Sequence, residues 1–127
     1  MLRVKRVYEA PAAEDGHRIL VDRLWPRGMT KAKLRAEAWR KDLAPRTELR
    51  EWFHHDLSKW DEFLRRYRME LESSGGWVGL MALARQAEEG TVTFLYGSRD
   101  TEHNQAIALR EIALGRGRPR SGKGKEG

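Results

Sequence analysis

Three segments of the chain have the hydrophobic patterning of β-strands. Residues 2–8 alternate apolar and basic side chains, which is typical of a half-exposed strand. Residues 17–24 contain the continuous apolar run Ile19–Val21, which suits a buried strand, and Pro26 then ends the segment because it cannot donate a ladder hydrogen bond. Residues 91–96 are β-branched and aromatic, and they form the strongest predicted strand.

The rest of the chain predicts helices, because apolar side chains recur there at helical spacing. Thr30 can cap the first helix, which begins at Lys31 and is stopped by Pro45. The later helices are a short one capped by Thr47, a longer one capped by Ser58 and ending at residues 73–76, one over residues 77–87 closed by Gly90, and a last one capped by Asp100 or Thr101 and reaching Leu114.

This order of elements predicts one α/β domain over residues 1–114, with a small, mostly parallel β-sheet covered by about five helices. The strands at residues 17–24 and 91–96 are separated by helices, and each leads into another helix. In a parallel sheet of this kind, ligands bind in the crevice beyond the carboxyl ends of the strands. We therefore expect functional side chains in the two loops that follow these strands.

Composition narrows the classes of protein. None of the 127 residues is Cys, which excludes disulfides, thiolate metal sites and cysteine nucleophiles. No apolar run approaches the roughly 20 residues of a membrane span and no signal-peptide core is visible, so we expect a soluble, cytoplasmic protein. Much of the net charge of +6 lies in residues 115–127, which hold five Lys or Arg and one Glu. We expect this Gly-rich tail to be disordered.

The first candidate site is the segment Asp-Arg-Leu-Trp-Pro-Arg-Gly at residues 22–28. Guanidiniums bind phosphate or carboxylate in a planar, bidentate way, and an indole can stack on a ligand. The helix after Thr30 would add N–H groups that favour anions. The ligand-binding residues predicted here are Arg23, Trp25, Arg27 and Gly28. The alternative is that Asp22 and Arg23 form an ion pair and that Trp25 covers the core.

The second candidate site is the segment from Tyr96 to Asn104, which also connects a strand to a helix. Arg99 is a predicted anion contact, and His103 in the first helical turn is a candidate general acid or base. The ligand-binding residues predicted here are Tyr96, Arg99 and Asn104. The alternative is that Asp100 only caps the helix and that His103 decorates its first turn.

The third candidate site is Trp-Phe-His-His-Asp at residues 52–56. Adjacent His residues on a helix point about 100° apart and do not chelate one metal easily, so we interpret His55 as a pocket residue and predict no metal. The sequence also lacks phosphate-binding glycine loops and a serine-nucleophile motif. No cofactor is predicted.

These motifs resemble a known family. The segments VDRLWPRG (residues 21–28), LAPRTELREWFHHD (residues 43–56) and FLYGSRDTEHNQAIALRE (residues 94–111) together are similar to the YeaO-like branch of the bacterial proteins called domain of unknown function 488. The resemblance extends over residues 3–114. It implies a small α/β domain of the bacterial cytoplasm and assigns no activity. The residues that match its motifs are Asp22, Arg23, Trp25, Pro26, Arg27, Gly28, Trp52, Phe53, His55, Asp56, Tyr96, Arg99, Asp100, His103 and Asn104.

Two classes of function remain open. The first is an arginine-rich pocket that binds a small anionic ligand, a nucleotide or a phosphorylated metabolite, with Arg23, Arg27 and Arg99 neutralising the anion. If the pocket is catalytic, hydrolysis or transfer at a phosphate or glycosidic bond is expected, with His55 and His103 as acid and base and Asp22 or Asp100 orienting them. The alternative is a non-enzymatic nucleic-acid-binding protein that uses the basic tail and Trp25. The oligomeric state stays open.

Overall fold

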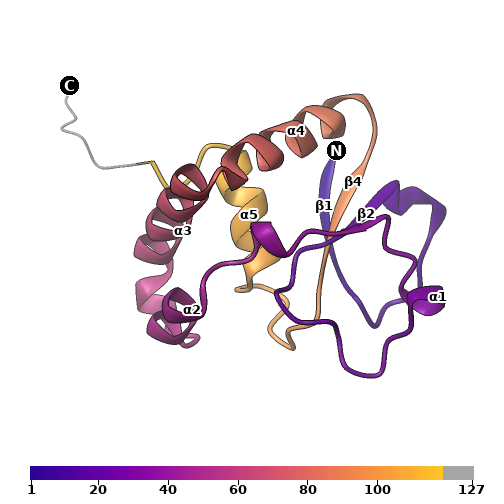
Figure 1. Ribbon diagram of the computed structural model, residues 1–127, viewed down its shortest axis with the longest axis horizontal. Coiled ribbons are helices and arrows are strands. Elements are labelled where there is room, and N and C mark those ends of the chain that lie inside the picture. Colours follow the sequence, from indigo (N-terminus) through magenta and orange to yellow (C-terminus); the bar gives the residue numbers. More distant parts are fainter. Residues whose placement is uncertain (119–127) are drawn as a thin grey trace.

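A four-stranded, wholly parallel β-sheet forms the centre of the molecule (Figure 1), and the computed structural model describes residues 1–118. The strands lie in the order β1–β4–β2–β3. They are β1 (Leu2–Arg6), β2 (His17–Leu20), β3 (Ala38–Trp39) and β4 (Val92–Tyr96). The three strands predicted from the sequence are present, and the prediction of a parallel sheet in an α/β fold is confirmed.

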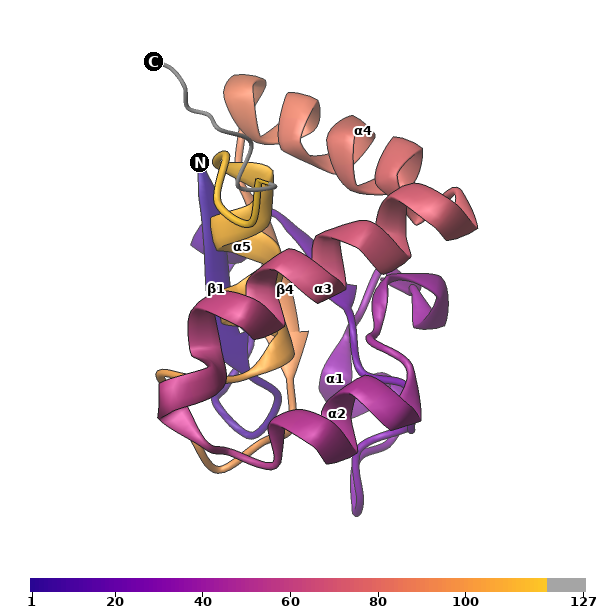
Figure 2. The same cartoon turned by 90° about the vertical axis from the view of Figure 1, so that its left-hand side faces the viewer.

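The helices pack in two unequal layers. α2 (Thr47–Phe53), α3 (Trp60–Ser74), α4 (Gly76–Glu89) and α5 (Gln105–Ala113) lie on one side of the sheet, and the short α1 (Lys31–Leu34) lies on the other (Figure 1). Seen from the helical side, α3 crosses in front of β4, α5 lies between α3 and the strands, and α4 runs along the top of the view (Figure 2). The strands are therefore covered by side chains from both directions.

The two central strands are buried on both faces, as the continuous apolar runs predict. Ile19 and Phe94 point into the larger core beneath α2–α5, while Leu20 and Leu95 point into a smaller core with Leu34 of α1. This alternation follows from the pleat, which sends successive side chains to opposite faces. The sheet is thereby fixed in register, because a slip by one residue would exchange the two sets.

The parallel register brings the carboxyl ends of β2 and β4 side by side. Leu20 pairs with Leu95, and the N–H of Val21 donates to the carbonyl of Leu95 at 3.1 Å. The loops that start at Asp22 and Gly97 consequently leave the sheet at the same edge. This is the edge where a ligand crevice is expected.

The helix predicted between Lys31 and Pro45 is wrong beyond its first turn. Thr30 caps it as predicted, accepting from the N–H of Lys33, but α1 ends when Arg35 adopts a left-handed conformation with φ of 53°. The chain then forms β3, whose flanking N–H groups donate to carbonyls of β2. Long-range hydrogen bonding here overrides a weak local helical pattern.

Three other predicted caps differ from the structure. Thr47 is the first residue of α2 rather than its cap, and Ser58 lies in a short 3-10 helix (Leu57–Lys59) that precedes α3. Neither Asp100 nor Thr101 caps α5; the cap is Asn104, whose side-chain oxygen accepts from the N–H of Ile107 at 3.0 Å. Because α5 begins at Gln105, the loop at the candidate site is several residues longer than the sequence predicts.

The start of the predicted tail packs against the helices. The guanidinium of Arg116 contacts carboxylate oxygens of Asp61 at 2.9 Å and Glu111 at 2.8 Å. Residues 119–127, which carry most of the predicted basic tail, lie outside the described residues. Within residues 1–118, no helix has the length and apolar character needed to cross a membrane.

Candidate functional site

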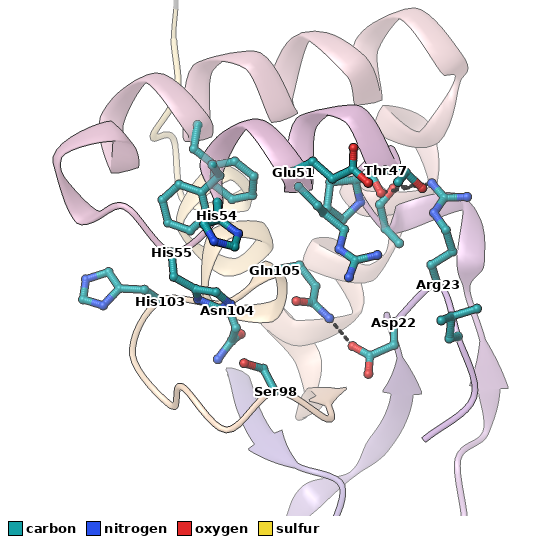
Figure 3. Close-up of a pocket in the computed structure, with 16 residues that line it drawn as sticks. Asp22, Arg23, Thr47, Glu51, His54, His55, Ser98, His103, Asn104 and Gln105 are labelled. Atoms are coloured by element: carbon teal, nitrogen blue, oxygen red, sulfur yellow. Dashed lines mark hydrogen bonds between the residues drawn. The ribbon is translucent and has the colours of Figure 1, made fainter. Parts of the chain in front are cut away.

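A hollow of about 440 Å³ opens at the carboxyl ends of β2 and β4 (Figure 3). Three segments supply its polar lining: the loop after β2, the helix α2 with the turn that follows it, and the loop from β4 into the start of α5. Its polar lining residues are Asp22, Arg23, Thr47, Arg50, Glu51, His54, His55, Ser98, His103, Asn104 and Gln105, and its apolar lining includes Phe53 and Phe63. Five of the predicted site residues meet here: Asp22, Arg23, His55, His103 and Asn104.

Asp22 contributes a carboxyl group to this lining. One of its oxygens accepts a 2.9 Å hydrogen bond from the N–H of Gly97, and the other accepts from the side-chain amide of Gln105. Burial raises the pKa of Asp22 to about 6, although these two hydrogen bonds and the nearby charge of Arg50 oppose the rise. The predicted alternative, an Asp22–Arg23 ion pair, is not formed among the described residues.

Arg23 lies at the end of the hollow near Thr47 (Figure 3). Its Nη2 donates to the carbonyl of Pro45 at 3.0 Å, which anchors the guanidinium. Its Nε is buried without a hydrogen-bond partner in the part of the protein that the structure describes. A buried N–H donor without an acceptor costs roughly 1–3 kcal/mol, and Arg23 carries this cost at the wall of the hollow.

The polar face of α2 supplies a second guanidinium that the motif analysis missed. Thr47, Arg50, Glu51 and His54 line the hollow at the spacing i, i+3, i+4 and i+7, which places them on one face of the helix. Arg50 is exposed and forms no ion pair within residues 1–118. The sequence carried a signal for this face, because it is the side of α2 opposite the buried Leu49.

The turn after α2 brings imidazole groups to the hollow. His54 and His55 both adopt left-handed backbone conformations, with φ of 42° and 56°. Such conformations are rare for residues with a Cβ and often mark functional turns. The Nδ1 of His55 lies 3.9 Å from a carboxylate oxygen of Asp100. The ring of His103 packs edge-on against Trp60 with centroids 5.0 Å apart.

The loop from β4 to α5 is held by its own polar side chains. A carboxylate oxygen of Asp100 accepts from the N–H groups of Glu102 and His103 at 2.9 and 3.0 Å. The hydrogen bond from Glu102 is the main reason that the pKa of Asp100 is lowered. Asn104 caps α5 and donates to the carbonyl of Asp100 at 2.8 Å. Both side chains thus stabilise the loop and the start of α5, in addition to lying near the hollow.

Other predicted site residues lie away from this hollow. Trp25 donates to the carbonyl of Met29 at 2.5 Å and meets Trp39 edge-on, with centroids 5.3 Å apart, so it covers the smaller core. Arg27 is exposed, and its carbonyl accepts from the hydroxyl of Tyr8 at 2.8 Å. The described lining also leaves out Gly28, Tyr96, Arg99 and Asp100. The two arginines that line the hollow are Arg23 and Arg50, not Arg27 and Arg99.

The site combines two guanidiniums and three imidazoles with the carboxyl groups of Asp22 and Glu51. This set offers charge-assisted donors for an oxyanion, and it places titratable groups beside them. Over residues 1–118, no group of three His, Cys, Asp or Glu side chains has an arrangement that could hold a metal ion. The chemistry available from these residues is recognition of an anion and exchange of protons.

The fold and this hollow define a small parallel α/β protein with a polar site at the strand ends, and comparison with known proteins gives its family. The family model described as "Inactive DUF488-N3 subclade" matches residues 1–124. The chain belongs to this DUF488 family, as its motifs predict.

Two curated relatives illustrate the family. The chain is 41% identical over 115 residues to "Uncharacterized protein Rv3073c" of Mycobacterium tuberculosis (strain ATCC 25618 / H37Rv), an alignment that covers 91% of this chain and 95% of that protein. It is 40% identical over 111 residues to "Uncharacterized protein YeaO" of Escherichia coli (strain K12), covering 85% and 92%. No solved structure matches the chain.

Proposed function

We propose that the hollow binds a small anionic ligand, a nucleotide or a phosphorylated metabolite, through Arg23 and Arg50. The observation that carries this proposal is that both arginines line one hollow while neither forms an ion pair with a carboxylate of residues 1–118. A guanidinium that is held in place without a counter-ion favours binding of an oxyanion, since the anion supplies the missing acceptors.

The two arginines have complementary roles in this proposal. Arg23 is anchored by the carbonyl of Pro45, so it holds its charge at a fixed place in the hollow. Arg50 is exposed on α2 and adds a second charge from the facing side. The imidazoles of His54, His55 and His103 line the same hollow and add positive charge when they are protonated.

Binding without turnover is the form of this function that the comparisons support. The matching family model carries the word "inactive" in its description. The side chain of Asp100 already holds the loop before α5 through hydrogen bonds from two backbone N–H groups, which leaves it less suited to orienting a catalytic imidazole. The cysteine-free sequence supports a cytoplasmic location for this role.

Sulfate is a suitable probe for the proposal, because it is an oxyanion with no other recognition group. Calorimetric titration of the full chain with sulfate near pH 6 should show saturable binding, and Arg50→Ala should weaken it by about tenfold or more. The matched control is the double variant Arg27→Ala with Arg99→Ala, which removes two exposed arginines outside the hollow. This control should bind as the parent does.

The outcomes separate the alternatives. Equal melting temperatures for Arg50→Ala and the parent show that the loss concerns binding rather than folding. Loss of binding in the double variant with retention in Arg50→Ala would move the anion site to Arg27 and Arg99. Absence of sulfate binding by the parent would refute the proposed function.

A further inference from the structure

The carboxyl group of Asp22 is the feature of the hollow that an anion site does not explain. It lines the same cavity as two guanidiniums, yet no Lys or Arg side chain of residues 1–118 pairs with it. Its two oxygens instead accept from two uncharged donors, the N–H of Gly97 and the side-chain amide of Gln105. An ionised carboxylate at this position would repel any oxyanion that enters the hollow.

Each carboxyl oxygen can accept two hydrogen bonds, and the protein uses one position on each. The remaining positions leave room for a proton without breaking the hydrogen bond from Gly97 or that from Gln105. A protonated Asp22 becomes an O–H donor in the cavity, and it then attracts the same oxyanion that its ionised form repels.

We propose that Asp22 is protonated in the ligand complex, that its O–H donates to the bound oxyanion, and that binding takes up one proton from solvent. No bond of the ligand is made or broken; the proton moves from water to the Asp22 carboxylate. This inference rests on the proposed anion site. It adds that the hollow selects oxyanions that accept a hydrogen bond from the Asp22 O–H. It also adds that the hollow releases these oxyanions as the solution becomes alkaline.

The electrostatics of the free protein support this coupling. Burial already raises the pKa of Asp22 to about 6, so an anion placed beside it raises that pKa further. Proton uptake then accompanies binding at neutral pH. Other charged or titratable groups surround Asp22. Arg23 follows it on the same segment, and His103 comes from the loop before α5. α2 and its turn contribute Arg50, Glu51, His54 and His55, and α3 contributes Tyr67.

The hollow also contains three imidazole side chains, so the test must isolate the carboxyl group of Asp22. Sulfate is the probe, because it stays a dianion from about pH 5.5 to about pH 8 and contributes no proton of its own. Calorimetry in buffers of different ionisation enthalpy gives the number of protons taken up.

Asp22→Asn is the variant, since the amide keeps the shape of the side chain and supplies a permanent N–H donor. Glu51→Gln is the matched control, because it removes the other carboxylate of the hollow.

For the parent, the dissociation constant for sulfate should rise by up to about tenfold for each pH unit above pH 6. Asp22→Asn should lose this dependence apart from the share of the imidazoles, and it should bind sulfate at least about tenfold more tightly than the parent near pH 8. Glu51→Gln should keep the pH dependence of the parent. A ¹³C titration of the Asp22 carboxyl in the parent should show a pKa at least about one unit higher with saturating sulfate than without it.

Three results would overturn the inference while leaving the anion site intact: unchanged proton uptake in Asp22→Asn, weaker sulfate binding by this variant at every pH, or a carboxyl pKa that sulfate does not raise. If the parent fails to bind sulfate at any pH in this range, the proposed function itself fails, and the inference fails with it. The carboxyl titration reads the parent protein, so it decides the question even if Asp22→Asn does not fold.

Discussion

The backbone N–H of Gly97 donates a 2.9 Å hydrogen bond to a carboxylate oxygen of Asp22, and this bond joins the loops that follow β4 and β2. The residues are 75 positions apart in the sequence, and only the parallel register of the two strands brings them together. A Cβ on residue 97 would lie 3.1 Å from that oxygen, so glycine permits the close approach. The bond secures the edge of the sheet where the hollow forms.

Asp22 should make the stability of the protein depend on pH in an unusual direction. The pKa of Asp22 is about 6 in the folded protein and near 4 in the unfolded chain, so the folded state holds this proton more tightly. The free energy of unfolding therefore falls as the pH rises from about 4 to about 6, and it stays reduced above that range. Relative to the parent, Asp22→Asn should be more stable near pH 7.5 than near pH 4 by about 2 kcal/mol, because only the parent loses the Asp22 proton over this range.

Urea denaturation of the two proteins at both pH values measures this difference directly. The other titrating groups are common to both chains, so they cancel when the two differences are compared. A relative stability of the two proteins that is the same at both pH values would show that folding does not raise the pKa of Asp22.

Gln105 controls how far the pKa of Asp22 rises. Its side-chain amide donates to the carboxylate, and this hydrogen bond stabilises the ionised form and lowers the pKa. Gln105→Leu removes the donor while keeping a side chain of similar size. We expect the pKa of Asp22 to rise above 6 by about one unit, as followed by ¹³C detection of the carboxyl group. Gln105→Glu would raise the pKa further, because it adds a like charge; an unchanged pKa in both variants would contradict this arrangement.

The sequence pattern identified three strands and their parallel arrangement, because the strands have a local hydrophobic pattern and helices separate them along the chain. The apolar run Ile19–Val21 and the β-branched and aromatic residues 91–96 place apolar side chains on both faces, and such strands are typical of a parallel sheet. β3 was missed because two residues, Ala38 and Trp39, carry almost no pattern. It forms because the N–H of Arg40 donates to the carbonyl of Leu20 at 2.8 Å, a long-range contact that local propensity does not contain.

The candidate site was predicted in part. Asp22 and His103 lie in loops whose place at the strand ends follows from the topology, and the structure brings both to the hollow. Arg27 and Arg99 lie in the same two loops, but the hollow is bounded by the other residues of these segments. Arg50 lies within the segment of residues 43–56 that resembles the family, but it was not among the residues predicted to bind a ligand. Its contribution depends on how α2 docks, which a linear pattern does not specify.

Gly16 occupies a backbone position that no other residue fits well. Its φ of 60° and ψ of −125° lie in a region used almost only by glycine. A Cβ there would also collide with the backbone carbonyl of Thr91, which accepts the 2.9 Å hydrogen bond from His17 at the start of β2. Gly16→Ala should therefore destabilise the protein by about 3 kcal/mol and lower the melting temperature by about 10 °C.

Gly28 provides the matched control for this substitution. Its φ is 75°, but a Cβ there would have no atom within 4 Å. Gly28→Ala should lower the free energy of unfolding by only about 1 kcal/mol, because the alanine would adopt the left-handed conformation without a steric collision. Differential scanning calorimetry of both variants separates the two effects, and equal losses would show that the contact with Thr91 relaxes freely.

The buried carboxylate of Asp15 should govern stability at acid pH. It contacts Lys5 at 3.1 Å and Arg18 at 2.5 Å, and it accepts from the N–H of Ala12 at 2.9 Å. Burial raises the pKa of Asp15, but these three hydrogen bonds outweigh it and leave the pKa below its ordinary value. A lowered folded pKa means that the stabilisation is complete above about pH 4 and is lost as the pH falls through the folded pKa.

Asp15→Asn leaves the buried Arg18 without its counter-ion, and it should cost about 3 kcal/mol near neutral pH. The loss should shrink at low pH, where the parent's own carboxyl is protonated. Urea denaturation near pH 7 and near pH 3 tests both statements, and a loss of equal size at the two values would assign the role of Asp15 to its hydrogen bonds rather than to its charge.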